Sequence, residues 1–280
     1  MLDAILNKIK EKEEKILTFV IKKLNSKPQK IAIAPKLAMK KERKKKKDRK
    51  FSDPVKVSTD VQARAIWQSV KQNYIFYIAL LIALYAFTRC QYKKSNFPLA
   101  VFSLFFITFY GYFVHLISHY MGTTISDLYK TYDNIFTRNT YLNWIAVKSI
   151  EFGEFHAQTH HDSEINKSKK NIALEFINNV VSQGGLLIIV KYFLQLLDNR
   201  VILLWAFFYA TVHNINYNLF SPLTHRQHHM NDKTNYGIDI WDIIVGSKYD
   251  WQTIETHNHT AVNVLCIAAV IVFCSNKFKL

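Results

Sequence analysis

The sequence predicts an all-α integral membrane protein: a helical bundle with about four transmembrane helices and a histidine-rich cap on its cytoplasmic side. Three observations support this fold class. Long apolar runs without charge recur along the chain, histidines gather in short boxes close to these runs, and basic residues are concentrated near the amino terminus. The chain has 280 residues and a formal charge of +16, of which +12 falls in residues 1–56. Such an excess of lysine and arginine beside a span marks the cytoplasmic side.

Three segments are expected in chain order. In residues 1–25, apolar side chains recur at helical spacing between lysines and glutamates, which predicts an amphipathic helix. Residues 26–59 form a basic linker that we expect to be disordered, because Lys27-Pro28 and Ala34-Pro35 would interrupt any helix there. Residues 60–280 form the membrane-embedded domain.

The linker carries a strongly basic arm. Nine of the eleven residues from 40 to 50 are basic: Lys40, Lys41, Arg43, Lys44, Lys45, Lys46, Lys47, Arg49 and Lys50. This density is typical of a segment that contacts an anionic surface, either the cytoplasmic leaflet of a membrane or nucleic acid. Because apolar spans follow, the arm is interpreted as binding the membrane surface and not nucleic acid. A solvated linker with no dedicated partner has the same composition.

The apolar runs that predict transmembrane helices are Tyr74–Thr88, Phe97–Val114, Val180–Leu197 and Val201–Val212. Crossing the hydrocarbon core takes roughly 20 mostly apolar residues, so the shorter runs must recruit flanking tyrosines and asparagines. Ala261–Cys274 is also apolar but only fourteen residues long. It fits an interfacial or buried helix at least as well as a span.

The histidines form three boxes and one outlier. They are His115 and His119; His156, His160 and His161; His225, His228 and His229; and the single His213. Offsets of three or four residues place two imidazoles on one helix face, where both can reach the same ion. A directly adjacent histidine projects about 100° away and can serve a second ion. The set therefore holds more ligands than one metal requires.

Topology brings the boxes to one membrane face. If the basic arm is cytoplasmic, the second span returns to the cytoplasm at His115, and the fourth returns at His213. Asp198, Asn199 and Arg200 form a tight polar turn between the third and fourth runs. The second box lies in a polar segment with no span separating it from the first. All the boxes are therefore expected on the cytoplasmic side.

The chemistry of the ligand set favours redox metals over zinc. Structural zinc takes four ligands and catalytic zinc three plus water, so this set exceeds what zinc needs unless two or three separate zinc ions bind. Two iron ions with open positions fit better and can activate dioxygen, whereas zinc has no redox chemistry. A zinc hydrolase would also be expected to carry an H-E-x-x-H motif, which the sequence lacks.

From Val201 onward the chain resembles the fatty acid hydroxylase and sterol desaturase family of membrane di-iron enzymes. The elements that carry the resemblance are His213-Asn214-Ile215-Asn216, Ser221-Pro222-Leu223-Thr224-His225-Arg226-Gln227-His228-His229, Asn235-Tyr236-Gly237, Trp241-Asp242 and Val245-Gly246-Ser247. The resemblance covers roughly residues 70–260. The chain departs from the family pattern at Leu116, at Tyr209, in the spacing of the second box, and in the 36 residues between His119 and His156.

The resemblance implies that the nine boxed histidines hold two iron ions on the cytoplasmic face, and that dioxygen is used there to hydroxylate or desaturate a lipid such as a fatty acyl chain or a sterol. It implies a location in the endoplasmic reticulum if the source is eukaryotic. No H-P-G-G haem motif is present, so electrons are expected from a separate donor such as cytochrome b5 with a reductase. The alternative is a polybasic membrane-tethering protein with a vestigial metal site.

Polar residues near the boxes are candidates to support the ligands. A ligating imidazole usually donates its second N–H to a carboxylate or a carbonyl. Asp162, Asn214 and Asp242 are the candidates to bond a ligand or a metal-bound water, while Glu154, Asp232 and Asp239 qualify by proximity alone. His257 and His259 are placed outside the metal ligands, because an i, i+2 offset shares a face in a strand and not in a helix.

Overall fold

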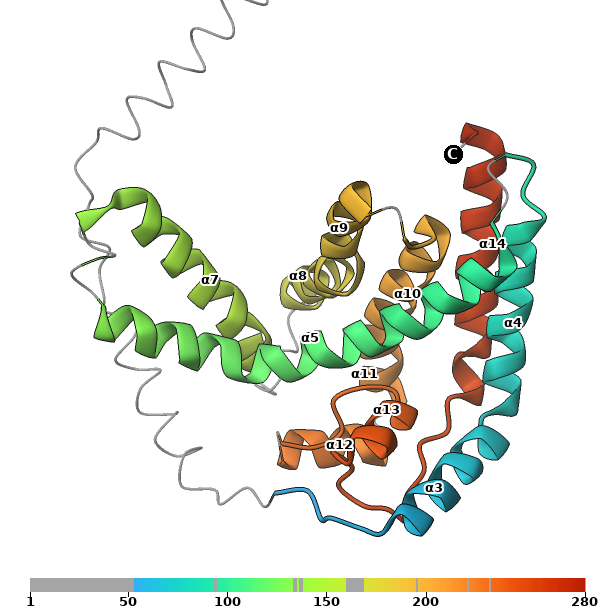
Figure 1. Cartoon of the computed structure of the whole chain (residues 1–280), viewed down its shortest axis with the longest axis horizontal. Coiled ribbons are helices and arrows are strands. Elements are labelled where there is room, and N and C mark those ends of the chain that lie inside the picture. Colours follow the sequence, from blue (N-terminus) through green and yellow to red (C-terminus); the bar gives the residue numbers. More distant parts are fainter. Residues whose placement is uncertain are drawn as a thin grey trace, which may run out of the picture. The chain divides into compact units, whose positions relative to one another are not determined.

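The computed structural model describes residues 53–92, 95–132, 135, 138–159, 169–194, 196–220, 222–231 and 233–279. Every regular element in this described part is helical, which confirms the predicted all-α class (Figure 1). The expected amphipathic helix of residues 1–25 and the basic arm lie outside the described residues. The same is true of His160, His161 and Asp162.

The helices differ widely in length. In chain order they are α3 (Thr59–Gln72), α4 (Tyr74–Thr88), α5 (Phe97–Thr131), α7 (Thr140–Thr159), α8 (Lys169–Val180), the π-helical η2 (Val181–Gly185), α9 (Leu186–Leu194), α10 (Asn199–Thr211), the π-helical η3 (Val212–Asn216), α11 (Tyr217–Phe220), α12 (Leu223–Met230), α13 (Asp239–Val245), the 3₁₀-helical η4 (Asn258–Thr260) and α14 (Ala261–Phe278).

The chain divides into two compact units. One contains residues 125–149, the end of α5 and the beginning of α7, where the Tyr129 hydroxyl donates to Asn143 Oδ1 at 2.8 Å. The other contains residues 51–124 and 150–280. All the site residues discussed below belong to this second unit.

Three helical stretches are long and apolar enough to cross a membrane: Phe97–Tyr120, Lys170–Ile189 and Asn258–Phe278. A fourth results if α3 and α4, which are bent by 68° at Asn73, form one span. These lengths and compositions indicate an integral membrane protein, as the sequence predicts. The carboxyl-terminal helix, which could have been interfacial, is thus long enough to span.

Two of the predicted spans differ from their apolar runs. The third begins at Lys170 and not at Val180, because the polar Glu175 and Asn179 are buried within the protein and let the helix extend toward the amino terminus. The fourth run forms α10, whose 13 residues rise only about 20 Å and do not cross a bilayer alone. Its helical path continues through η3 and α11 to Phe220.

Polar contacts at both ends hold α14 beside α4, and the two helices run in the same direction (Figure 1). Near their first residues, the Asn73 side chain donates to the Glu255 carbonyl at 2.9 Å and accepts from the His257 amide. At the far end, the buried Arg200 donates to Ser275 Oγ and to the Tyr92 carbonyl. The interior between α4, α10 and α14 is filled by apolar side chains such as Phe76, Phe87, Val201, Trp205 and Val264.

The helices α5, η2 and α10 approach one another closely about one turn before His115. Gln183 in η2 donates to the Gly111 carbonyl at 3.3 Å and accepts from Trp205 Nε1 at 3.2 Å. A Cβ atom on Gly111 would lie 2.3 Å from Gln183 Oε1, so a larger residue here would displace the Gln183 side chain from its hydrogen bonds. Gln183 lies in the π-helical segment η2, and His213 lies in the π-helical segment η3. Single π-helical turns within α-helices are frequent at functional sites.

The helix α3 packs mainly against the short helix α13. Ala65 is buried against Ile243 and Ile254, and Gln62 donates to the Ile243 carbonyl at 3.3 Å. Ahead of the helix, the Val55 carbonyl accepts from Trp251 Nε1 at 3.1 Å. Residues 55–65 are therefore joined to α13 and to the segment that follows it.

Candidate metal centre

Three histidines form a compact group at the end of the α5 span. His115 and His119 lie one turn apart on α5, and His228 reaches them from α12; their ligand atoms all lie within 4.8 Å of one another. The ring centroids are 5.1 Å apart for His115 and His119, and 4.8 Å for each of these with His228. Metal–nitrogen bonds of about 2.0–2.1 Å place ligands of one ion up to about 4 Å apart. Small side-chain movements would therefore bring all three onto one ion.

His228 is held in the form that a metal requires. Its Nδ1 atom lies 2.6 Å from the Thr234 carbonyl oxygen, which can only accept, so Nδ1 carries the proton and Nε2 has its lone pair available. The residue is fully buried. Burial, and then the neighbouring His115, hold the pKa of His228 well below its usual range, so the ring is neutral at physiological pH.

His115 has a comparable support from a tyrosine. Its Nδ1 atom lies 3.2 Å from the Tyr209 hydroxyl, so Nε2 is the ring atom that would bind a metal. Tyr209 is on α10, one turn before His213, and its ring stacks on the His213 ring at 5.1 Å. The sequence identified Tyr209 only as a departure from the family pattern. The structure places it between two of the expected ligands.

The Asn-Tyr-Gly and Trp-Asp elements are joined by hydrogen bonds and pack against the histidines. Asp242 accepts from the backbone amides of Tyr236 and Gly237 at 2.8 and 2.9 Å, and from the Ser247 hydroxyl at 2.6 Å. The Tyr236 ring in turn packs against the three histidines, with centroid distances of 5.6–6.1 Å. Burial raises the pKa of Asp242 to about 7, against the lowering effect of these three hydrogen bonds. In this structure Asp242 therefore supports the histidines through the Tyr236 turn.

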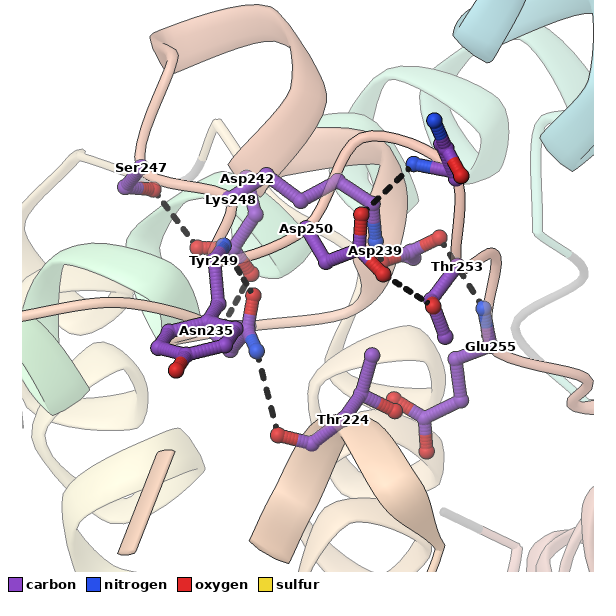
Figure 2. Close-up of polar contacts among 12 residues, drawn as sticks. Thr224, Asn235, Asp239, Asp242, Ser247, Lys248, Tyr249, Asp250, Thr253 and Glu255 are labelled. Atoms are coloured by element: carbon purple, nitrogen blue, oxygen red, sulfur yellow. Dashed lines mark hydrogen bonds and ion pairs between the residues drawn. The ribbon is translucent and has the colours of Figure 1, made fainter. Parts of the chain in front are cut away.

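The turn also needs its asparagine and its glycines. Asn235 has a left-handed backbone with φ 56°, which asparagine tolerates better than most residues. Its side chain accepts from the Tyr249 amide and donates to the Thr224 carbonyl, both at 3.1 Å, and so joins the turn to α12 (Figure 2). Gly246 ends α13 with φ 85°, and a Cβ on Gly237 would lie 3.1 Å from the Tyr112 ring.

A second set of imidazoles adjoins the first. The Nε2 atoms of His225 and His229 are 3.0 Å apart, and the His213 ring lies 5.2 Å from His225 and 5.6 Å from His115. Six of the nine predicted ligands thus form one continuous cluster. His156 lies on α7, but its side chain, like all of His160 and His161, is outside what the structure describes. The contribution of the second box remains a prediction.

The other predicted supporting residues have different roles. Asn214 is buried in η3, and its side chain donates to the Ala210 carbonyl at 2.9 Å, one turn earlier in the same helix. Asp239, considered by proximity alone, forms a buried ion pair with Lys248 and accepts from the Glu255 amide at 3.1 Å (Figure 2). Asp162, Asp232 and the Glu154 side chain lie outside the described residues.

A small cavity of about 30 Å³ opens between the two sets of histidines and the cap. His115, His213 and His225 line it together with Tyr217, Glu255 and His257, and Trp205, Phe208 and Val212 of α10 form an apolar wall. His257 was predicted to lie outside the ligands, and no sequence motif pointed to Glu255 or Tyr217. Residues 253–257 have no helix, so Glu255 and His257 share a face as alternate residues of an irregular segment.

Comparison of the chain with models of protein families, with curated proteins and with solved structures found no match. The family resemblance therefore rests on the sequence motifs. The structure itself establishes a helical protein of membrane type, with a buried group of three histidines that could bind a metal ion.

Proposed function

We propose that this chain is a dioxygen-dependent membrane di-iron oxygenase that hydroxylates or desaturates a lipid, of the fatty acid hydroxylase and sterol desaturase type. The observation that carries the proposal is the group of His115, His119 and His228, which joins the first and third boxes at the end of a membrane-length helix. The third box also supplies the motifs on which the family resemblance depends.

The residues present fit a redox metal. Neutral imidazoles suit iron, and the bond from His228 Nδ1 to the Thr234 carbonyl makes Nε2 the ring atom that would bind the ion. When bound, iron would supply the redox chemistry by which dioxygen is activated and an unactivated C–H bond is broken. His115, His119 and His228 would hold one ion, and His213, His225 and His229, with the second box, would contribute to another. The Tyr236 ring shields the group on one side.

The lipid substrate would approach from the bilayer along the apolar helices. Phe102, Phe105 and Phe106 are exposed on α5, below the histidines, and Phe207 is exposed on α10. The three phenylalanines on α5 lie on a membrane-length helix, where exposed apolar side chains are suited to contact with acyl chains. Together with the cytoplasmic position expected for the boxes, they support a substrate that stays in the membrane while its reacting carbon reaches the metal.

Lipid mass spectrometry tests the proposal. Cells that express the chain would be compared with cells that express His228→Ala, and with His259→Ala as the control because His259 does not belong to the three-histidine group. A product with one added oxygen identifies a hydroxylase, and one that lacks two hydrogens identifies a desaturase. Identical lipids from the chain and His228→Ala would refute the enzymatic function.

Electrons for this reaction would come from a separate protein, such as cytochrome b5 with its reductase. The net charge of +12 in residues 1–56 suggests that the basic arm helps an acidic donor to dock, besides contacting the membrane. Deleting residues 1–56 should then slow electron transfer and weaken its dependence on salt. Unchanged turnover and unchanged salt dependence would exclude this role of the arm.

A further inference from the structure

We propose that Glu255 and His257 are ligands of a metal ion in the cavity beside the three-histidine group, together with His213 and His225. All four residues line this cavity. Such a site combines one carboxylate with imidazoles, whereas the sequence motifs imply histidine ligands alone. This second metal position presupposes the metal binding proposed above, but it does not presuppose the oxygenase reaction.

The ligand atoms of Glu255 and His257 are buried and available. Glu255 is 7% exposed and His257 is 4% exposed, and both Glu255 Oε1 and His257 Nε2 lack a hydrogen-bond partner. A buried polar atom without a partner costs about 1–3 kcal/mol, so such atoms usually mark a missing ion, water or ligand. Two of them border one cavity whose other lining residues include imidazoles.

The backbone that carries the two residues is held firmly. The Glu255 amide donates to Asp239, whose other oxygen is paired with the buried Lys248. The Asn73 side chain bonds the Glu255 carbonyl and the His257 amide at once, at 2.9 and 2.6 Å. In Figure 2 the Glu255 side chain extends toward Thr224 of α12, which also lines the cavity. Ligands that are fixed in this way lose little entropy when an ion binds.

Charge favours a cation here. Of the three acids that line the cavity, Asp239 is neutralised by Lys248, and Asp242 accepts three hydrogen bonds. Glu255 accepts a hydrogen bond from the Tyr217 hydroxyl, and no ion pair is recorded for it among the described residues. Buried carboxylates are normally paired with a cation or bound to a metal. An ion at this place would compensate the charge of Glu255.

The size of the cavity decides between an ion and a lipid. A volume of about 30 Å³ holds one or two groups the size of a water molecule, and is far too small for an acyl chain or a sterol. Tyr217 contacts three of the four proposed ligands, because its ring lies 4.4 Å from His225 and 5.9 Å from His213 while its hydroxyl bonds Glu255. Glu255 and His257 therefore adjoin the expected ligands and do not form a distant pocket.

The test is the metal content of the purified full-length chain, measured by inductively coupled plasma mass spectrometry after loading with ferrous iron. We expect Glu255→Gln and His257→Gln each to lower the iron content by about one ion per chain. His259→Gln, two residues from His257 and outside the cavity lining, should leave it unchanged. Glu255→Asp keeps the carboxylate and should retain the ion. Helical circular dichroism and size-exclusion profiles would verify that each variant is folded.

Iron contents of Glu255→Gln and His257→Gln equal to that of the unmodified chain would overturn the proposal. If these variants do not fold, titration of the metal-free unmodified chain and of Glu255→Asp with Co²⁺ decides. We expect the unmodified chain and Glu255→Asp each to bind two equivalents of Co²⁺. Visible Co²⁺ spectra that differ between these two proteins support carboxylate ligation, whereas identical spectra overturn it. Loss of iron in the variants while the unmodified chain makes no oxidised lipid would refute the proposed function alone.

Discussion

Replacing Lys248 by methionine should severely destabilise the cap over the histidines. Lys248 and Asp239 form an ion pair in which the side chains are only 1% and 3% exposed. Methionine keeps most of the volume of the lysine but removes its charge, so Asp239 would remain buried without a cation. Asp239 also accepts from the Glu255 amide, which ties this pair to the wall of the cavity.

The expected cost follows from burial. Removing one partner of a buried pair typically costs about 3–5 kcal/mol, because the other charge stays desolvated. The Asp127–Lys130 pair provides a matched comparison, since its side chains are 76% and 70% exposed. Exposed pairs of this kind contribute at most about 0.5 kcal/mol. Lys130→Met should therefore be nearly silent, and Asp239→Asn should recover most of the loss when it is combined with Lys248→Met.

Acid should relieve the defect. Burial already raises the pKa of Asp239 although Lys248 lowers it, and loss of Lys248 would raise this pKa further. The folded variant then binds a proton that the unfolded chain has released, so the deficit should shrink as the pH falls from 8 to 5. Thermal and denaturant unfolding in detergent micelles measures each value. A loss below 1 kcal/mol at pH 8, or a loss equal to that of Lys130→Met, would refute the reasoning.

Three further outcomes follow from contacts in the structure. Gly111→Ala should destabilise the chain by about 1–3 kcal/mol in unfolding experiments, because its Cβ would lie 2.3 Å from Gln183 Oε1, whereas Gly185→Ala meets nothing closer than 3.6 Å and should be neutral. Tyr209→Phe removes the contact with His115 Nδ1 and should weaken metal binding about 10–100-fold in competition with a chelator, while the exposed Tyr85→Phe should not. Asp242 keeps its proton to about pH 7 when folded but only to about pH 4 when unfolded, so stability should fall as the pH rises through this window, by up to about 4 kcal/mol, and Asp242→Asn should flatten that slope. An unchanged slope in Asp242→Asn would contradict the pKa.

Much of the architecture could be predicted because it depends on local periodicity. The helical offset of His115 and His119 places both on one face of α5, and apolar runs anticipate the membrane-length helices. Run boundaries were less predictable. Because Glu175 and Asn179 are polar, hydropathy places them outside the predicted span. In the structure both are buried within the protein, and the helix extends through them. Tertiary packing, which hydropathy does not record, sets the position of this span.

The predicted supporting residues show a different limit. Asp242 was chosen because it belongs to the Trp-Asp element, and the expected partner was an imidazole or a bound water. In the structure Asp242 instead accepts hydrogen bonds from the backbone amides of the Asn-Tyr-Gly turn, five and six residues earlier in the chain. The two motifs, which are separate in sequence, are thus one hydrogen-bonded unit in the structure. A spacing argument locates the ligands, but only the fold shows which polar residues position them.

The grouping of the histidines follows the same logic. Helix geometry predicts that the adjacent His228 and His229 project about 100° apart and can serve different ions. In the structure His228 joins His115 and His119 of α5, while His229 contacts His225, which lies beside His213. Which ion a histidine serves therefore depends on what lies opposite each face of α12. For His257, an i, i+2 offset argued against a helical ligand pair, but His257 instead shares its face with Glu255 in an irregular segment. An acid two residues from a histidine, outside any helix, is the local signal that should direct the search for ligands beyond the boxes.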